Sequence, residues 1–370
     1  MNLESKNLRD SIDRELRNFL GRVGGEFTHL SAGWIVDQLA EVALNGGKRM
    51  RPLLCCWGYA AGGGIAEGAS DSSRVVKAAA SLELLHTFAI VHDDIMDAAL
   101  SRRSRPPVHK RIAELDEVKQ GKLEPGHYGV SAAILIGDIA LALSDRLFME
   151  SGFEAGRLAE AWQPLIKMRQ DAAAGQYLDI SHSGPFKGDP APNQELNPQI
   201  ASNIARLKTA GYSIRGPLLV GATLAGASGK AKKALEAYGE AVGEAFQLAD
   251  DLMGMFGDPE QTGKDRETDL RNGKPTLLIA NALAQASEDE KKIIKKAWGN
   301  PAATERDIHE ARAAIVSSGA VKAVKQRIHD LIAKSKKATE NPTANNLNPE
   351  PCNYLTSLAE KISTQADSYT

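Results

Sequence analysis

Residues 83–97 read Glu-Leu-Leu-His-Thr-Phe-Ala-Ile-Val-His-Asp-Asp-Ile-Met-Asp, and they close an apolar run that begins near residue 73. The run has helical periodicity, so Asp93 and Asp97 lie one turn apart on the same face. Like charges at this spacing destabilise a helix, and carboxylates among apolar residues are costly unless something positive binds them. An acidic helix C-terminus also opposes the helix macrodipole. The stretch therefore predicts a long helix whose end binds a cation.

The rest of the chain repeats this helical pattern. Apolar residues recur at spacings of three and four, and the period-two alternation of strands is nearly absent. We predict long helices at 34–45, 73–98, 131–149, 154–180, 201–226 and 231–256, and a short one at about 353–365. Loops are expected at 114–129, 181–199 and 337–351. The predicted fold class is all-α, a single domain over 1–370 built as a bundle of long helices.

The composition narrows the classes of partner. The 45 Lys and Arg residues nearly balance the 47 Asp and Glu residues, so we expect no nucleic acid and no anionic membrane as partner. Cys55, Cys56 and Cys352 fit core residues in a reducing cytoplasm better than a disulfide framework or a zinc site. We find no signal-peptide pattern and no uninterrupted apolar run of the roughly 18 residues that span a bilayer. We therefore expect a cytoplasmic protein without a transmembrane segment.

A second pair of carboxylates, Asp250 and Asp251, ends another long apolar run. Residues 243–254 read Gly-Glu-Ala-Phe-Gln-Leu-Ala-Asp-Asp-Leu-Met-Gly. Two such clusters in one chain predict a negatively charged site for Mg²⁺, and Mg²⁺ usually brings phosphate with it.

Basic residues that could bind phosphate occur at four places. Residues 46–52 read Gly-Gly-Lys-Arg-Met-Arg-Pro, where the glycines let the backbone approach an anion closely. The other basic residues are Arg102 and Arg103 after the first cluster, Lys208 beside Thr209, and Lys264 and Lys274 after the second cluster. Taken singly, each has an ordinary interpretation: a surface turn, a salt-bridged helix end, a snorkelling lysine or a solvated loop.

Taken together, these motifs resemble the polyprenyl synthetase family, the trans-isoprenyl diphosphate synthases, over about residues 44–280. The motifs stand in the family's order: the basic motif from Gly46, the Asp-Asp-x-x-Asp cluster with its trailing Arg-Arg, Gly137-Asp138, Gly175-Gln176-Tyr177-Leu178-Asp179, Lys208-Thr209, and Phe-Gln-x-x-Asp-Asp from Phe246. The resemblance implies the isoprenoid synthase type I fold, in which helices surround a deep central cavity and the aspartate clusters face each other across its mouth. It also implies a homodimer.

The resemblance implies a reaction as well. An allylic diphosphate (dimethylallyl, geranyl or farnesyl diphosphate) binds through three Mg²⁺ ions, for which Mn²⁺ can substitute, and its C–O bond ionises. The double bond of isopentenyl diphosphate attacks the allylic cation, and a proton is lost to the departing diphosphate. Metal ions and lysines stabilise the leaving group, and a dry cavity protects the cation from water.

Matching motif positions assigns a role to each residue. The metal residues are Asp93 and Asp97 for two ions and Asp250 for the third, supported by Asp94 and Asp251. The residues for the allylic diphosphate are Arg102, Lys208, Lys264 and Lys274. The residues for isopentenyl diphosphate are Lys48, Arg51, His86 and Arg103. The catalytic residues are Lys208 and, with their oxygen dipoles facing the cation, Thr209, Gln176 and Gln247.

Three further positions carry weaker expectations. His92 should support the first cluster rather than bind metal. Arg49 should face solvent, a dimer partner or the core. Gly254 departs from the family, because many members carry Asp there, and we expect the change Gly254→Asp to be tolerated.

Phe88 and Ala89 are expected to set the product length. They lie five and four positions before Asp93, about 6–7.5 Å down the helix at roughly 1.5 Å per residue. Ala89 leaves room for a growing chain, and Phe88 closes part of the pocket. We expect geranylgeranyl diphosphate (C20), with farnesyl diphosphate (C15) as the alternative.

Two other functions share part of these motifs. A terpene cyclase has the first cluster, but its second metal motif is of the Asn/Ser/Glu type and it lacks a second diphosphate site. A non-catalytic partner subunit usually loses aspartates from the clusters. Both aspartate pairs are present here together with Lys48 and Arg51, which favours a catalytic synthase.

Overall fold

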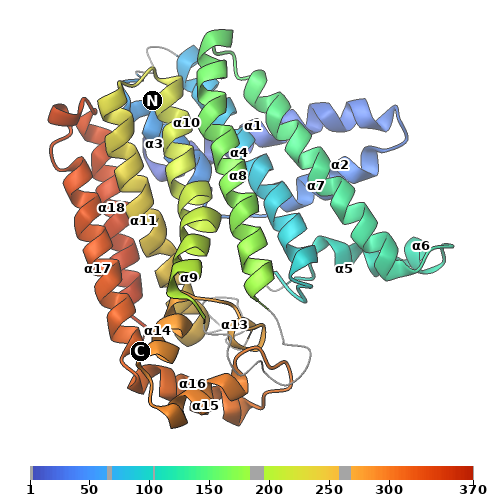
Figure 1. Cartoon of the computed structure of the whole chain (residues 1–370). Coiled ribbons are helices and arrows are strands. Elements are labelled where there is room, and N and C mark those ends of the chain that lie inside the picture. Colours follow the sequence, from blue (N-terminus) through green and yellow to red (C-terminus); the bar gives the residue numbers. More distant parts are fainter. Residues whose placement is uncertain (1–2, 65–68, 103–104, 184–195, 258–267, 370) are drawn as a thin grey trace. The chain divides into compact units, whose positions relative to one another are not determined.

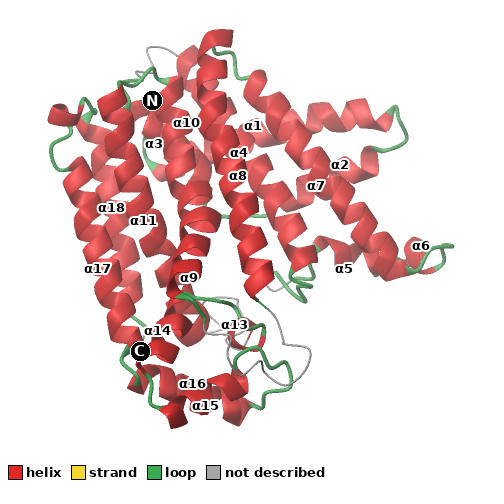
Figure 2. Ribbon diagram, in the orientation of Figure 1, coloured by secondary structure: helices red, strands yellow, loops and turns green. Residues whose placement is uncertain are grey.

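The computed structural model describes residues 3–64, 69–102, 105–183, 196–257 and 268–369. In these ranges the chain is helical, and Figure 2 shows no strand among them. The helices are α1 Ser5–Thr28, α2 Gly33–Leu44, α3 Met50–Ala61, α4 Ala69–Met96, α5 Val108–Ala113, α6 Asp116–Lys119, α7 Pro125–Met149, α8 Ala155–His182, α9 Pro198–Ile204, η1 Ala205–Arg215, α10 Gly216–Leu224, α11 Gly229–Phe256, α13 Thr268–Arg271, α14 Leu277–Gln285, α15 Glu288–Ala297, α16 Glu305–Ser317, α17 Ala320–Thr339, η2 Thr343–Asn345 and α18 Pro349–Asp367. The predicted all-α class is confirmed.

Helix boundaries differ from the predictions where capping residues override composition. The expected loop 114–129 contains α6 and the start of α7, because Pro125 opens that helix and the Glu124 carboxylate accepts hydrogen bonds from two backbone N–H groups. The expected loop 181–199 lies largely in residues 184–195, outside the described residues.

The expected loop 337–351 is wrong in its extent. α17 continues to Thr339, and α18 begins at Pro349 rather than near residue 353. The Asn348 side chain caps α18 by accepting a hydrogen bond from the Glu350 N–H, and Pro349 stands in the first turn, where a missing N–H costs nothing. The Asn-Pro-Glu-Pro sequence within the expected loop is therefore a helix start.

The chain divides into two compact units. The first comprises Met1–Gln163 and Pro217–Lys232, and the second comprises Pro164–Gly216 and Lys233–Thr370. The boundaries fall inside α8, α10 and α11, and the α8 boundary coincides with a proline inside that helix. The first aspartate cluster and the basic motif from Gly46 belong to the first unit, and the second aspartate cluster and Lys208-Thr209 belong to the second.

In the first unit, α4 is the central helix and packs against α1, α3 and α7 (Figure 1). Its segment Ser73–Met96 is long and apolar enough to cross a membrane by length and composition, but 67% of its 18-residue apolar stretch is buried inside the protein. Core helices have this property, because every face of such a helix meets apolar side chains. The burial follows from packing within the unit.

The cysteines of α3 are core residues, as predicted. Cys55 and Cys56 are fully buried, and burial raises the pKa of the Cys56 thiol to about 12. A Cβ at Gly221 of α10 would overlap the Cys55 carbonyl oxygen, so the helices touch backbone to backbone. Neither thiol is accessible for chemistry.

In the second unit, α11 packs beside α17 and α18 (Figure 1). The Tyr238 hydroxyl, fully buried, donates a hydrogen bond to the Leu355 carbonyl of α18 at 2.6 Å. Arg327 of α17 donates to the Glu244 carboxylate of α11 at 2.8 Å. These contacts hold α11, which carries the second aspartate pair, against its neighbours.

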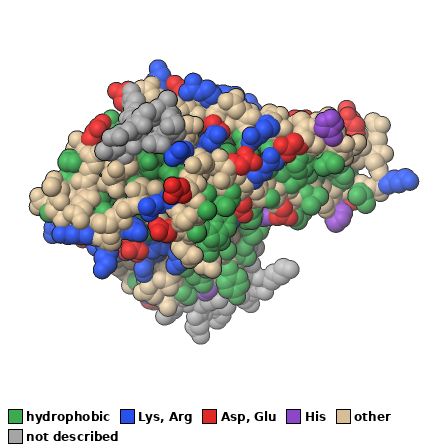
Figure 3. Space-filling view, turned by 90° about the horizontal axis from the view of Figure 1, so that it is seen from above, with side chains coloured by type: hydrophobic (Ala, Val, Ile, Leu, Met, Phe, Trp, Pro, Cys, Tyr) green, Lys and Arg blue, Asp and Glu red, His purple; other side chains and the backbone are tan. Residues whose placement is uncertain are grey.

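Charged side chains of both signs are interspersed on the face drawn in Figure 3. This distribution agrees with the formal net charge of −2. Anion binding must therefore come from local groups of basic residues.

Candidate functional site

The end of α4 places two aspartates one helical turn apart. The Asp97 N–H donates a hydrogen bond to the Asp93 carbonyl at 2.8 Å, so the helical turn continues past the last helical residue, Met96. Ala98 then takes a left-handed conformation (φ 48°), and the Ala99 N–H closes on the Asp94 carbonyl at 2.9 Å. This helix end fixes the backbone of the first cluster.

Asp94 binds Arg102. The Arg102 Nε lies 2.7 and 2.8 Å from the two oxygens of Asp94, and Arg102 Nη2 lies 3.6 Å from Asp93 Oδ2. The Asp94 side chain is 5% exposed, and burial raises the pKa of its carboxyl although Arg102 acts to lower it. Asp94 therefore holds Arg102 beside the cluster, whereas Asp93, 27% exposed, is accessible to a cation.

Arg102 is also held through its backbone. Arg102 and Arg105 exchange two backbone hydrogen bonds, at 2.7 and 3.1 Å. Arg103, predicted to bind isopentenyl diphosphate, lies outside the described residues.

A basic pocket of about 400 Å³ opens where α3 begins, and it includes Lys48, Arg51 and His86. Gly46 and Gly47 adopt left-handed conformations before it (φ 70° and 114°), which glycine allows without strain. The structure thus brings together the three described members of the predicted isopentenyl diphosphate set, from the turn, from α3 and from α4.

Arg49 anchors this pocket from inside the core. Its side chain is 2% exposed and donates to Asp13 Oδ1 and to Glu83 Oε1, both at 2.7 Å. Burial acts to lower the pKa of Arg49, but the two carboxylates overcome this and raise it. Of the three environments considered from sequence, the core is the one observed. The ion pairs tie α1, the start of α3 and α4 together beneath Lys48 and Arg51.

In the second unit, Gln247 links the Lys208-Thr209 pair, here called the KT motif, to the second cluster. The Thr209 hydroxyl donates to Gln247 Oε1, and Gln247 Nε2 donates to Asp251 Oδ1 at 2.7 Å. Both ends of the Gln247 amide are thereby oriented. These hydrogen bonds connect Thr209, Gln247 and Asp251 in one chain.

Asp179 gathers two of the predicted lysines. Its Oδ2 lies 2.6 Å from Lys208 Nζ and 3.3 Å from Lys274 Nζ. Burial acts to raise the pKa of this 7% exposed carboxyl, but Lys208 and Lys274 overcome the effect and hold it below its usual range. Asp179 belongs to the Gly175–Asp179 motif, but no role for it is predicted from the sequence; its spacing of three from Gln176 on a helix was the available signal.

Of the two other predicted residues of this unit, the structure describes Gln176 but not Lys264. Among the described residues, Gln176 Nε2 is buried and has no hydrogen-bond partner, so this amide can serve a substrate group. Lys264 lies outside the described residues.

The KT motif lies in a π-helix, η1, where a continuous helix over 201–226 was predicted. Glycines of the flanking helices explain how its backbone fits. A Cβ at Gly175 of α8 would overlap the Lys208 N, and one at Gly243 of α11 would overlap the Ala210 Cα. The wide turns of a π-helix are uncommon and recur at functional sites.

Gly254 faces a carboxylate from another helix. A Cβ built there would overlap Asp269 Oδ2 of α13. An aspartate at position 254 would therefore displace the Asp269 carboxylate and bring a second negative charge close to it, which opposes the expectation that Gly254→Asp is tolerated.

Gly254→Asp should lower the free energy of unfolding by about 1–3 kcal/mol, the usual cost of overpacking, with like-charge repulsion adding to it. Urea unfolding measures the change. Gly254→Ala is the uncharged control for the overlap, and Gly254→Asp combined with Asp269→Gly should regain much of the loss. A single Gly254→Asp variant as stable as the parent protein would contradict this reading of the packing.

The donor set fits Mg²⁺. In the described part of the chain no three His, Cys, Asp or Glu side chains converge into a complete metal site. Mg²⁺ does not require one, because it is usually bound by one or two carboxylates together with water and substrate phosphates. Asp93 with Asp97, and Asp250, meet that requirement in their respective units.

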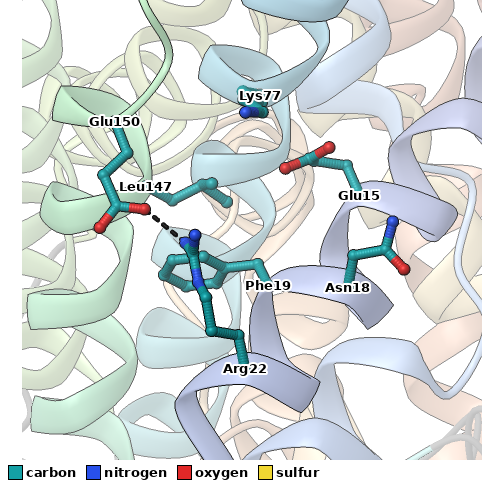
Figure 4. A pocket seen from close by; sticks show the side chains of 7 residues that line it. All are labelled: Glu15, Asn18, Phe19, Arg22, Lys77, Leu147 and Glu150. Carbon is teal, nitrogen blue, oxygen red and sulfur yellow. Dashed lines mark hydrogen bonds and ion pairs between the residues drawn. The ribbon is translucent and has the colours of Figure 1, made fainter.

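A second pocket of the first unit carries none of these residues (Figure 4). Its volume is about 250 Å³, and α1, α4 and α7 line it. Arg22 Nη2 donates to Glu150 Oε2 at 2.5 Å across it, as the dashed line in Figure 4 shows. No predicted site residue lines it, so we assign the function to the clusters above.

Comparisons with known proteins point to one family. A model of the polyprenyl synthetase family matches residues 33–315. The geranylgeranyl diphosphate synthase of Sulfolobus acidocaldarius is 32% identical over 266 residues, which cover 71% of each chain. The geranylfarnesyl diphosphate synthase of Aeropyrum pernix is 32% identical over 81% of this chain and 86% of its own. A geranylgeranyl pyrophosphate synthase structure from Corynebacterium glutamicum, complexed with isoprenyl diphosphate and magnesium, aligns with a TM-score of 0.88 at 33% identity, over 98% of this chain and 99% of its own.

Proposed function

We propose, given that this chain belongs to the polyprenyl synthetase family, that it condenses isopentenyl diphosphate with allylic diphosphates to make geranylgeranyl diphosphate. It is a trans-prenyltransferase with the all-α isoprenoid synthase fold. The observation that carries the proposal is the presence of both aspartate clusters together with the basic pocket of Lys48, Arg51 and His86. We treat the two compact units as one catalytic domain.

Asp93, Asp97 and Asp250 would hold Mg²⁺, and we expect three ions, with Mn²⁺ able to substitute. When bound, the metal supplies positive charge that stabilises the leaving diphosphate. Asp94 would orient Arg102 toward the same diphosphate, because both of its carboxylate oxygens accept from the Arg102 Nε–H. Asp251 orients Gln247.

Each of the two substrates would be bound by its own set of basic residues. Lys208 and Lys274, held together by Asp179, would bind the allylic diphosphate with Arg102. Lys48, Arg51 and His86 would bind the diphosphate of isopentenyl diphosphate, which must sit where its double bond can reach the cation.

Polar side chains would stabilise the allylic cation after the C–O bond breaks. Thr209 and Gln247 form a hydrogen-bonded pair whose oxygens are the negative ends of their dipoles. Gln176, whose amide nitrogen is buried, would contribute its amide oxygen. Fixed dipoles in a site without water stabilise charge better than water does, because they need no reorganisation.

The proposal is tested by incubating the purified chain with Mg²⁺, isopentenyl diphosphate and each allylic primer, and measuring the chain length of the dephosphorylated products. We expect geranylgeranyl diphosphate as the main product. Farnesyl diphosphate as the end product would replace the C20 assignment by the C15 alternative. Hydrocarbon formed without isopentenyl diphosphate would indicate a terpene cyclase, and no turnover with any primer would favour a non-catalytic partner subunit.

Phe88→Ala should lengthen the product, because the aromatic ring that closes the pocket beneath the first cluster is removed while Ala89 already leaves room. We expect products beyond C20 to become the main species. Phe153→Ala is the matched control: its ring packs against Tyr59, with centroids 5.8 Å apart, and its loss should leave product length unchanged. If Phe88→Ala keeps the parent product, Phe88 is not the floor of the pocket.

A homodimer is the expected assembly, in the cytoplasm. Exposed apolar side chains lie along α7 at Tyr128, Leu135 and Met149, with exposures of 36%, 55% and 56%. A stripe of this kind favours burial against a second copy. Sedimentation analysis measures the assembly state.

A further inference from the structure

The side chain that precedes the first cluster, His92, packs on the proposed product-length residue. Phe88 and His92 are four residues apart on α4, and their rings meet edge to face with centroids 4.7 Å apart at 63°. Such geometry is favoured by the opposite charges of a ring's edge and face. The orientation of the Phe88 ring therefore depends on where the His92 ring is held.

The far edge of the His92 ring is held by α7. His92 Nε2 lies 3.1 Å from the Ile134 carbonyl, which can only accept, so this nitrogen donates. Asp138 Oδ1 lies 3.7 Å from the same nitrogen. These contacts fix the ring to a neighbouring helix rather than to its own.

Gly137 of α7 provides the space that this arrangement needs. A Cβ there would overlap both Nε2 and Cδ2 of His92. Any larger residue at 137 must displace the imidazole, and with it the edge that touches Phe88. The contact of Gly137 with His92 and the contact of His92 with Phe88 thus connect α7 to the Phe88 ring.

We propose that His92 and Gly137 are positioning residues that hold the Phe88 ring and thereby set the product length. This inference rests on the proposed function, in which Phe88 closes the pocket. His92 touches no reacting atom in this role; it acts through Phe88. With His92 removed, Phe88 can rotate aside, and the pocket admits a longer chain.

The test compares product ratios in four single variants and two double variants. In His92→Ala, the ratio of products beyond C20 to C20 should rise about tenfold, which corresponds to about 1.4 kcal/mol. His92→Gln, which retains a donor for the Ile134 carbonyl but lacks the ring, should shift the ratio similarly. Gly137→Ala should shift it as well, because the imidazole is displaced.

Double variants distinguish a positioning role of His92 from a general loss of structure, because the effects of coupled residues on the product ratio do not add. In the Phe88→Ala background, adding His92→Ala should change the product ratio little, because the ring that His92 holds is gone. In the His92→Ala background, adding Gly137→Ala should likewise have little effect. A change in total rate alone would not alter these ratios.

The outcomes separate the two proposals. If Phe88→Ala lengthens products and neither His92 variant does, the positioning role is overturned and the proposed function stands. If the His92 variants lengthen products while Phe88→Ala does not, His92 acts by another route, and both the positioning role and the Phe88 floor fail. Unchanged ratios in all variants would also overturn the positioning role.

Discussion

Asp93→Ala should lower turnover with isopentenyl diphosphate and an allylic primer by about a thousandfold or more. The carboxylate is accessible at the end of α4 and is proposed, together with Asp97, to bind two Mg²⁺ ions. Metal ions supply several kcal/mol of charge stabilisation in such reactions, and each 1.36 kcal/mol is about tenfold in rate. Asp250→Ala should have an effect of the same order.

Steady-state rates at saturating Mg²⁺ provide the measurement. Asp289→Ala is the matched control, because this carboxylate is 89% exposed on α15, and its loss should leave turnover within a factor of about two. Circular dichroism would verify that each variant is folded. Activity of Asp93→Ala close to that of the control would remove the first cluster from the proposed mechanism.

Arg49→Met should lower the free energy of unfolding by about 3–5 kcal/mol, because it leaves the Glu83 carboxylate buried without its partner. The Glu83 side chain is only 7% exposed and its Oε1 lies 2.7 Å from Arg49 Nη1. The same change should weaken binding of isopentenyl diphosphate, since Arg49 lies between Lys48 and Arg51 and fixes the turn that carries them. Urea unfolding and the KM for isopentenyl diphosphate measure the two effects.

Two further variants serve as controls for Arg49→Met. Arg306→Met breaks an exposed ion pair with Glu310 on α16, where Arg306 is 86% exposed, and should cost no more than about 0.5 kcal/mol. Arg49→Met combined with Glu83→Leu should regain stability relative to Arg49→Met alone, because no buried charge remains unpaired. An Arg49→Met protein as stable as the Arg306→Met control would show that the buried pair is not an anchor.

Residue types and spacing predicted the central helices well. The apolar run before Asp93 appears as α4, and the run before Asp250 appears as α11, each within a few residues of the predicted bounds. Periodicity is a local property, so a single sequence contains it. Boundaries near 349 were missed because the prolines and asparagines of a helix start also occur in loops.

The members of the site were also predictable, but not their partners. Lys48, Arg51 and His86 were grouped by motif and meet in one pocket. Asp179 was overlooked as the carboxylate that gathers Lys208 and Lys274, because its partners come from elements 29 and 95 residues away. Such pairings are not encoded in any local pattern.

The sequence by itself determined an all-α protein, the residues of two acidic clusters and the basic motif that accompanies them, because these depend on residue type and on spacing along one helix. Tertiary structure decided the rest. It placed Arg49 in the core, set Asp269 against Gly254, and seated His92 against Gly137 behind Phe88. Each of these depends on how closely two backbones approach, and that distance is set by packing between segments far apart in the chain.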